Sequence, residues 1–460
     1  MATATVLARE LAGIVGRDHV RTDDGALVAY ARDATPLFHS RPEAVVLPGS
    51  TEEVAAVLRH ATAHGIPVVP RGAGSNLCAA TVPLAGGIVL VLTRLNQLLE
   101  ISSGELLARA QSGVSTATLS AAAAAKGLLY APDPGSHTVS TIGGNVATCA
   151  GGLRGLKYGV TRNYVLGLEA VLPTGEIIRT GGRLWKDVAG YDLTRLLTGS
   201  EGTLAVITEA TVALLPAPAE AGTGVAYFDS LADASRAVTA VIGAGIVPAT
   251  LEFLDRKCIR AVEEFAGLGL RQDAGALLLF GDDGPAATVA ANLARIQDVC
   301  TQNGALEVTL AENVARSEAL LEARRCSLPA LSRLGSLTIL EDATVPRHRM
   351  ADMVDRIDAI AEKYDLRIAT FGHAGDGNLH PTCVLDPDDT DGADRAHKAF
   401  AEIFAAAIGM DGTITGEHGV GAAKFPYLAD RLGDDQMALL RRIKAAFDPA
   451  GILNPGKLGS

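Results

Sequence analysis

The sequence of 460 residues predicts an α+β fold in two main parts, and three observations support this. Residues 44–48 and 66–70 are short apolar runs on either side of the amphipathic segment 52–65, which is typical of a strand–helix–strand unit. Strand-like runs continue to about residue 216. From about 225 to 405 helical segments alternate with strands, which favours an antiparallel sheet covered by helices.

The individual elements follow from local signals along the chain. The first forty residues predict a helix followed by irregular chain. Ser50 precedes two glutamates and is a good N-cap for the helix that Gly65 should end. The turn at 71–76 follows the next strand, and the segment 120–129 (SAAAAAKGLL) predicts an exposed helix.

Residues 130–165 consist mostly of loop signals, and a loop-rich stretch of this length in a compact domain is usually functional. Further strands should follow it, and residues 217–225 (APAEAGTGV) read as a linker. We therefore expect a first domain over 1–217, a second over 218–410 and a C-terminal segment over 411–460.

Charge and composition exclude several classes of protein. The chain carries 40 basic and 52 acidic residues, a formal net charge of −12, which argues against binding to nucleic acid or to an anionic membrane. Its six cysteines form no CxxC pair, so we expect buried thiols and no iron–sulfur cluster. The N-terminus lacks the pattern of a signal peptide, and the longest apolar runs are far too short to span a bilayer. These features predict a cytoplasmic protein without a transmembrane segment.

Two apparent motifs are rejected. Val241–Pro248 (VIGAGIVP) resembles a dinucleotide-binding fingerprint, but it ends a helix and has proline at the third glycine position. Asp386–Gly392 (DPDDTDG) resembles a calcium loop, but neither register places glycine and glutamate where such a loop needs them. We interpret it as a solvated loop.

Pro70–Asn76 (PRGAGSN) is a stronger candidate. It follows a strand, and its glycines allow successive backbone N–H groups to point into one concavity that can bind phosphate. A second set of glycine-rich loops, PDPGS and TIGGN, lies further along the chain. Two such sets suit a pyrophosphate held from two sides.

These motifs carry a resemblance to a known family. PRGAGSN, PDPGSHTVSTIGGNVATCAGGLRGLKYGVT and KDVAGYDLTRLLTGSEGTLAVITEATVALLP resemble the flavin domain of vanillyl-alcohol-oxidase-type flavoproteins. The similarity is greatest to the branch of D-lactate dehydrogenases and the glycolate oxidase flavin subunit, and it extends over about 42–457. It implies a PCMH-type FAD-binding domain of two α+β subdomains, noncovalently bound FAD, and an α+β cap domain on an antiparallel sheet.

The resemblance also implies which residues contact FAD, and these fall in two loops and three later positions. His137 lies near the second loop and is interpreted as a neighbour only. The implied residues are Arg71, Gly72, Ala73, Gly74, Ser75, Asn76 and Leu77, then Pro132, Asp133, Ser136, Thr141, Gly143 and Asn145, then Tyr158, Gly159, Glu201, Val206, Ile207 and Asn454.

A second constellation combines GHAGDGNLH (372–380) with TGEHG (415–419). His373, His380 and Glu417 are suitable ligands for zinc, manganese or iron, and the glycines between the histidines permit a turn that would bring them together. On spacing alone, ordinary polar residues are an equally good explanation. The resemblance implies that these three bind a divalent metal, most readily zinc, and that His418 is the catalytic base.

The chemistry of 2-hydroxy-acid oxidation explains such a set. Hydride leaves C2 for flavin N5 while the hydroxyl proton also leaves, and an alcohol is too weakly acidic for this at neutral pH. A divalent metal lowers the pKa of that hydroxyl, and a histidine can then take the proton.

The substrate carboxylate needs a cation, and Arg324 and Arg325 are the candidates. The resemblance favours Arg324, with His373, Asn378 and His418 also expected at the substrate. Leu328 and Leu340 occupy stretches where relatives that act on dicarboxylates should be polar. This favours a small or apolar-tailed acid such as lactate or glycolate.

The sequence therefore predicts FAD-dependent oxidation of a D-2-hydroxy acid to the 2-oxo acid. An oxygen-using sugar or phenol oxidase on the same scaffold, or a flavin subunit of a larger electron-transfer complex, stays open as the alternative. The electron acceptor could be a quinone, a cytochrome, an electron-transfer flavoprotein or an iron–sulfur subunit, and it could hold the chain at a membrane surface. A homodimer also stays open.

Overall fold

The computed structural model describes residues 2–460, and side chains from Val6 onward. The chain divides into two compact units. Unit 1 contains the described residues up to Ala150, together with Val160–Ala217 and Glu417–Ser460, and unit 2 contains Gly151–Gly159 and Pro218–Gly416. Residues 151–159 thus group with unit 2, although they lie within the first predicted range. None of the helices in residues 2–460 has the length and apolar character required to cross a bilayer.

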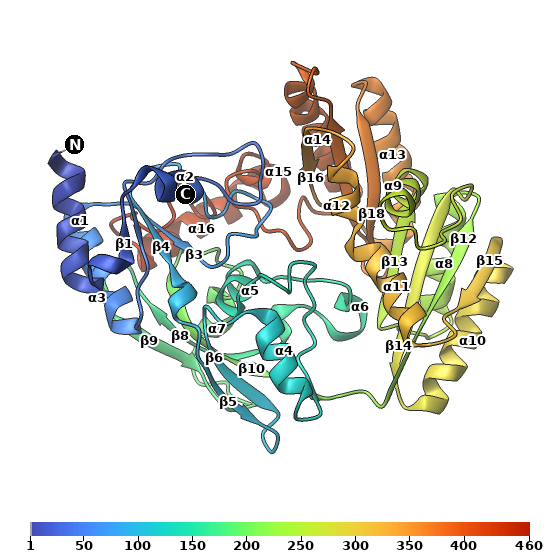
Figure 1. Ribbon diagram of the computed structural model, residues 1–460, viewed down its shortest axis with the longest axis horizontal. Coiled ribbons are helices and arrows are strands. Elements are labelled where there is room, and N and C mark those ends of the chain that lie inside the picture. The colour runs from blue at the N-terminus through green and yellow to red at the C-terminus, as the bar shows by residue number, and fades with distance from the viewer. Residues whose placement is uncertain (1) are drawn as a thin grey trace. The chain divides into compact units, whose positions relative to one another are not determined.

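The first layer of unit 1 is a four-stranded sheet in the order β1-β2-β4-β3 (Figure 1). Strands β2, β4 and β3 are parallel, and β1 is antiparallel at the edge. The predicted strand–helix–strand unit is confirmed, since Ser50 Oγ accepts the backbone N–H of Glu53 and Gly65 ends the helix in the left-handed region. The elements are β1 (Val20–Arg21), β2 (Ala44–Val46), β3 (Val68–Arg71), β4 (Ile88–Val91), α1 (Ala2–Val15), α2 (Asp24–Ala29) and α3 (Thr51–His64).

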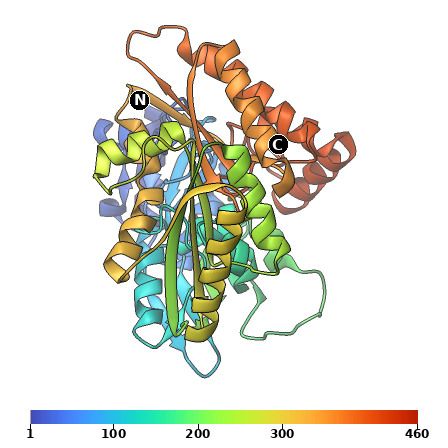
Figure 2. The same ribbon diagram turned by 90° about the vertical axis from the view of Figure 1, so that its right-hand side faces the viewer.

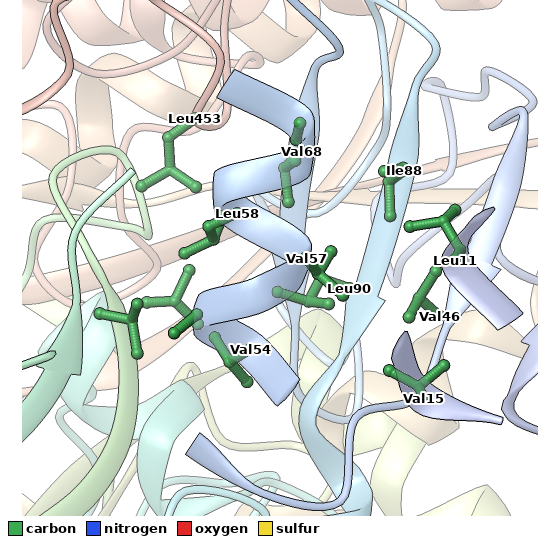
Figure 3. Packing of buried hydrophobic residues seen from close by; sticks show 14 of the residues in the cluster. Leu11, Val15, Val46, Val54, Val57, Leu58, Val68, Ile88, Leu90 and Leu453 are labelled. Atoms are coloured by element: carbon green, nitrogen blue, oxygen red, sulfur yellow. The ribbon is translucent and has the colours of Figure 1, made fainter. Parts of the chain in front are cut away.

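The core of this layer joins segments from both ends of the chain (Figure 3). Val54, Val57 and Leu58 of α3 pack with strand residues such as Ile88, and Leu453 belongs to the same cluster. The backbone N–H of Val68 donates to the carbonyl of Ile452, so the C-terminal segment is hydrogen-bonded to β3. The chain end therefore helps to fix the strand from which the first glycine-rich loop departs.

The second layer of unit 1 is an antiparallel sheet of five strands in the order β5-β6-β10-β8-β9. The glycine-rich window carries only short helices, as its loop signals predict. The elements are β5 (Leu98–Ser102), β6 (Leu107–Gln111), β8 (Val165–Val171), β9 (Ile177–Gly181), β10 (Val206–Ala213), the pair β7 (Leu128–Leu129) and β11 (Leu215–Pro216), with α4 (Thr116–Ala124), α5 (Ile142–Thr148), α7 (Leu193–Leu197), α15 (Leu428–Leu432) and α16 (Asp434–Phe447).

Unit 2 is built on an eight-stranded sheet in the order β15-β12-β14-β13-β18-β19-β16, with β17 also paired to β19. Its pairings are antiparallel throughout, as the sequence predicts. The strands are β12 (Glu220–Phe228), β13 (Thr250–Asp255), β14 (Ala276–Gly284), β15 (Ala305–Leu310), β16 (Leu337–Leu340), β17 (Ala343–Thr344), β18 (Arg367–His373) and β19 (Asn378–Leu385).

Two groups of helices cover this sheet. Helices α10, α8, α13 and α14 follow one another in a row, each in contact with the next, and Figure 2 shows α8 and α10, green to yellow, in front of the strands. Helices α9, α11 and α12 form the other group. The helices are α6 (Gly155–Tyr158), α8 (Leu231–Gly243), α9 (Arg256–Ala266), α10 (Ala286–Gln302), α11 (Val314–Arg325), α12 (Ser327–Ser332), α13 (Met350–Lys363) and α14 (Gly392–Gly409).

The linker predicted at 217–225 is wrong, because β12 begins at Glu220 and pairs with both β14 and β15. The glycines that suggested flexibility serve packing instead. A Cβ at Gly222 would lie 2.5 Å from Leu293 Cδ1, and one at Gly224 would lie 2.5 Å from Phe280 Cζ. The small residues of this strand therefore make room for large neighbours.

Candidate active site

Strand register gathers the polar residues of unit 2 in neighbouring positions of three adjacent strands. Glu252 on β13 pairs with His373 on β18, and His373 pairs with Asn378 on β19. In the next row Phe371 pairs with His380. Because side chains two residues apart on a strand point to the same face, Phe371 lies beside His373, and Asn378 beside His380, on one face.

The turn expected between the two histidines is present. β18 ends at His373 and β19 begins at Asn378, so only four residues connect them. Gly377 has φ of 84°, and a Cβ there would lie 2.1 Å from the carbonyl oxygen of Val345. Only glycine meets both demands, which explains its place between the histidines.

His373 and His380 are buried, with 5% and 2% of their surface exposed, and their ring centroids are 5.1 Å apart. His373 Nδ1 lies 2.8 Å from Glu252 Oε1, and His380 Nδ1 lies 2.9 Å from Asp342 Oδ1. A carboxylate on Nδ1 leaves Nε2 as the ligand atom, which is the usual arrangement around a protein-bound metal. The donor set therefore fits a divalent cation such as zinc.

Asp342 also anchors the chain that leads to the other two predicted residues. Its Oδ2 accepts Thr415 Oγ1 at 3.0 Å and the backbone N–H of Gly416 at 3.2 Å. Glu417 and His418, the predicted ligand and base, follow directly in the sequence. A single buried carboxylate thus orients one histidine and fixes the residue before Glu417.

Asn378 is buried beside this segment. Its Oδ1 accepts Thr344 Oγ1 at 2.7 Å, and a Cβ at Gly416 would lie 2.5 Å from its Cγ. The close approach requires glycine at 416.

Arg324, at the end of α11, is also held by Glu252. Its Nε donates to Glu252 Oε2 at 2.7 Å, and its guanidinium carbon lies 4.7 Å from the ring centroid of Phe371. Within residues 6–460, whose side chains are described, neither of its terminal Nη atoms has a hydrogen-bond partner. Arg324 can therefore offer both to a carboxylate, whereas Arg325 is only partly buried.

The first glycine-rich loop leaves β3 in unit 1, and its own side chains hold its shape. Arg71 donates to the carbonyl of Arg32 at 2.6 Å and lies over the ring of Tyr30. Asn76 Oδ1 accepts the backbone N–H of Ala80 at 2.9 Å. Gly74, with φ of 74°, has no room for a Cβ beside the Arg71 guanidinium. The Arg71 side chain thus supports the loop that the backbone of 72–77 forms.

The second loop meets the first within unit 1. A Cβ at Gly72 would lie 2.4 Å from Thr141 Oγ1, and Thr141 caps α5 by accepting the backbone N–H of Gly144 at 3.2 Å. Gly143 is packed against Ser112, and Asn145 Nδ2 donates to Thr116 Oγ1 at 2.7 Å. Pro132, Asp133 and Ser136 lie in the loop before α5. The two glycine-rich loops are therefore neighbours, as a pyrophosphate cradle requires.

The later predicted FAD residues divide between the units. Val206 and Ile207 begin β10 and are buried in unit 1, whereas Tyr158 and Gly159 fall in unit 2. There the Tyr158 hydroxyl donates to Asp283 Oδ1 at 2.7 Å, beside the ion pair of Lys157 with Asp282.

Glu201 and Asn454 hold the C-terminal segment of unit 1 together. The Glu201 carboxylate accepts the backbone N–H groups of Val420 and Gly421 at 2.6 and 2.7 Å. Asn454 Nδ2 donates to the carbonyls of Glu201 and Ala80, and its Oδ1 accepts Lys457 Nζ at 2.6 Å. Burial raises the pKa of Glu201, and the two N–H groups oppose that rise. Asn454 thus ties the chain end to the residues after the first loop.

Sequence reasoning missed Glu252, Asp342 and Phe371. Glu252 lies in a run of apolar residues, LEFLD, where an acid in a buried strand needs a partner. This acidic residue in an apolar strand is the signal that could have identified Glu252 as a site residue. Nothing in the sequence connects it with His373, which lies 121 residues away.

Two protein-family models match parts of the chain. Residues 217–458 match the model of "FAD linked oxidases, C-terminal domain", and residues 42–181 match that of "FAD binding domain". The chain is 50% identical over 449 residues to "Glycolate oxidase subunit GlcD" of Bacillus subtilis, covering 98% of this chain and 96% of the relative. It is 36% identical to "D-lactate dehydrogenase" of Anaerostipes hadrus, covering 91% of this chain and 90% of the relative.

Solved structures support the fold. The structure titled p-cresol methylhydroxylase with substrate bound superposes with a TM-score of 0.85 at 18% identity, covering all of this chain and 97% of that one. At such identity the likeness shows the fold alone. It confirms the predicted α+β architecture of the vanillyl-alcohol-oxidase (PCMH) type.

Proposed function

Since the chain belongs to the FAD-linked oxidases, we propose that it oxidises a D-2-hydroxy acid, D-lactate or glycolate, to the 2-oxo acid. The observation that carries the proposal is the buried pair His373 and His380, which shares one sheet face with Arg324. Relatives named glycolate oxidase subunit and D-lactate dehydrogenase support this choice of substrate.

When bound, FAD would supply the acceptor for the hydride of C2, and a divalent cation would supply a Lewis acid that lowers the pKa of the substrate hydroxyl. The glycine-rich loops around Gly72 and Thr141 would hold FAD. His373, His380 and Glu417 would hold the cation, zinc in the first place and manganese or iron as alternatives. Each histidine Nδ1 already has a carboxylate partner, which supports this use of Nε2.

The remaining residues bind the substrate and move its proton. Arg324 binds the carboxylate through its two Nη atoms while Glu252 keeps its Nε. Asn378 lies beside the histidines and contacts the substrate's polar groups. His418 follows Glu417 directly and takes the hydroxyl proton as C2 loses its hydride.

Turnover requires an electron acceptor, because the reduced flavin must be reoxidised. We propose a separate partner: a quinone, a cytochrome, an electron-transfer flavoprotein or an iron–sulfur subunit. The relative's name calls it a subunit, and this favours the second candidate, a flavin subunit of a larger electron-transfer complex that catalyses the same oxidation. Such a partner could hold the chain at a membrane surface, and two copies could pair as a homodimer.

Dye-linked turnover by the purified FAD-loaded chain tests the proposal. We expect D-lactate or glycolate to drive reduction of an artificial acceptor, and L-lactate to fail. His418→Ala should abolish the turnover and leave FAD bound. A chain that holds FAD and a metal but turns over neither acid contradicts the substrate class. Unchanged turnover by His418→Ala contradicts the assignment of the base.

A further inference from the structure

Glu252 occupies a position between two residues of different function. It lies on β13 with 1% of its surface exposed, and each of its carboxylate oxygens has a separate partner. Oε1 lies 2.8 Å from His373 Nδ1, and Oε2 lies 2.7 Å from Arg324 Nε. The buried Glu252 carboxylate therefore connects His373, the expected metal ligand, with Arg324, the residue expected to bind the substrate carboxylate.

We propose that Glu252 is a positioning residue that fixes His373 in the tautomer whose Nε2 can bind a cation and holds Arg324 beside it. The proposal rests on the proposed function, since it takes His373 as a metal ligand and Arg324 as the substrate's partner. It adds that the two sites depend on one side chain that touches neither substrate nor metal.

The hydrogen bonds dictate where the proton of His373 must be. An ionised carboxylate only accepts, so the neutral imidazole facing it carries its proton on Nδ1. The lone pair is then on Nε2. Arg324 Nε only donates, so it must face an oxygen, and this is the constraint that a substitution can exploit.

Glu252→Gln uses that constraint. The amide oxygen must face Arg324 Nε, because the guanidinium cannot accept a hydrogen bond. The amide NH₂ then faces His373 Nδ1, which has to accept. The proton of His373 therefore moves to Nε2, where it blocks metal binding.

The first test is a titration of the metal-free, FAD-loaded protein with Zn²⁺ against a chromophoric chelator. We expect Glu252→Gln to bind Zn²⁺ roughly 10- to 100-fold more weakly, the usual effect of losing a histidine's hydrogen-bond partner. The matched control is Glu402→Gln, since Glu402 also bridges two basic side chains, Arg356 and Lys363, but lies on α14. It should bind Zn²⁺ as the unsubstituted protein does.

A rescue separates the tautomer from a general structural effect. In the double variant Glu252→Gln with Arg324→Met, the Nε donor of Arg324 is absent. The amide oxygen at position 252 is then free to face His373 Nδ1. The loss of Zn²⁺ affinity caused by Glu252→Gln should therefore be clearly smaller in the Arg324→Met background than beside Arg324. A structural defect at residue 252 would give the same loss in both backgrounds, and that result overturns the proposal.

The tautomer of His373 can also be measured directly in the unsubstituted protein. This measurement tests the proposal even if the Glu252→Gln variant fails to fold. ¹⁵N NMR of histidine-labelled, metal-free protein at pH 8 should show His373 with protonated Nδ1 and unprotonated Nε2, and the signals are assigned with His373→Asn. Protonated Nε2 overturns the proposal. If the unsubstituted protein binds no Zn²⁺ at all, the proposed metal site fails instead, and the tautomer at His373 is then read by NMR alone.

Discussion

His380 and Asp342 form a buried pair in which imidazole Nδ1 lies 2.9 Å from carboxylate Oδ1. The other oxygen of Asp342 accepts the backbone N–H of Gly416, which precedes Glu417. The carboxylate therefore orients a proposed metal ligand and anchors the segment that carries the next ligand and the proposed base.

Asp342→Asn should lower turnover at least about tenfold without releasing FAD. The amide oxygen has to stay with the Gly416 N–H, so the NH₂ group meets His380 Nδ1 and forces its proton onto Nε2. Dye-linked kcat and the ratio of FAD to protein measure the two effects. Asp388→Asn, in an exposed loop of the same unit, is the control. Equal turnover in both variants would contradict the role of Asp342.

Arg324→Met should raise KM for the hydroxy acid by at least about 30-fold, with a smaller effect on kcat. The reason is the loss of a buried, charge-assisted contact with the carboxylate, which is worth roughly 2 kcal/mol or more. Arg325→Met is the comparison. A rise in KM for Arg325→Met alone would reverse the assignment of the two arginines.

Gly72→Ala should reduce the FAD content of the purified protein. The added Cβ would lie 2.4 Å from Thr141 Oγ1, so Thr141 or the loop that carries residue 72 must shift. Absorbance of the flavin band relative to the protein band measures retention. Gly104→Ala is the control, because a Cβ there has open space around it. Full FAD occupancy in Gly72→Ala would show that the contact between the loops does not form the cofactor site.

Because of Lys457, the free energy of unfolding of unit 1 should increase as the pH rises through the alkaline range. Burial lowers the pKa of Lys457 to about 8, while an unfolded lysine titrates near pH 10.4. Between these values the unfolded chain binds more protons, so stability rises with pH over this range, by roughly 3 kcal/mol in total.

The comparison is Lys457→Met, which cannot titrate. Unfolding of both proteins at pH 7.5 and pH 10 should show the unsubstituted protein gaining stability relative to the variant. A difference that does not change with pH would mean that Lys457 keeps an ordinary pKa in the folded protein.

The sequence predicted those parts of the site whose residues lie close together along the chain. The glycines between His373 and His380 predicted their hairpin, and PRGAGSN predicted the loop after β3. Register explains what was missed, because Glu252 reaches His373 only through the pairing of β13 with β18. No local pattern encodes such a pairing between distant strands.

One prediction failed for reasons of packing. The small residues at Gly222 and Gly224 resembled a linker but lie in a central strand, where they accommodate Leu293 and Phe280. Arg71 stays a predicted cofactor contact, and its guanidinium is hydrogen-bonded to the carbonyl of Arg32. In both cases the sequence does not reveal the neighbour, because it comes from elsewhere in the fold.

The visible spectrum of the FAD-loaded protein, recorded without oxygen before and after addition of D-lactate or glycolate, tests the central claim most directly. We predict that the flavin band bleaches with at least one of these acids, that it does not bleach with L-lactate, and that the 2-oxo acid appears in equal amount to the flavin reduced. A band that stays oxidised with both D-lactate and glycolate, in protein that retains FAD and metal, would contradict the account.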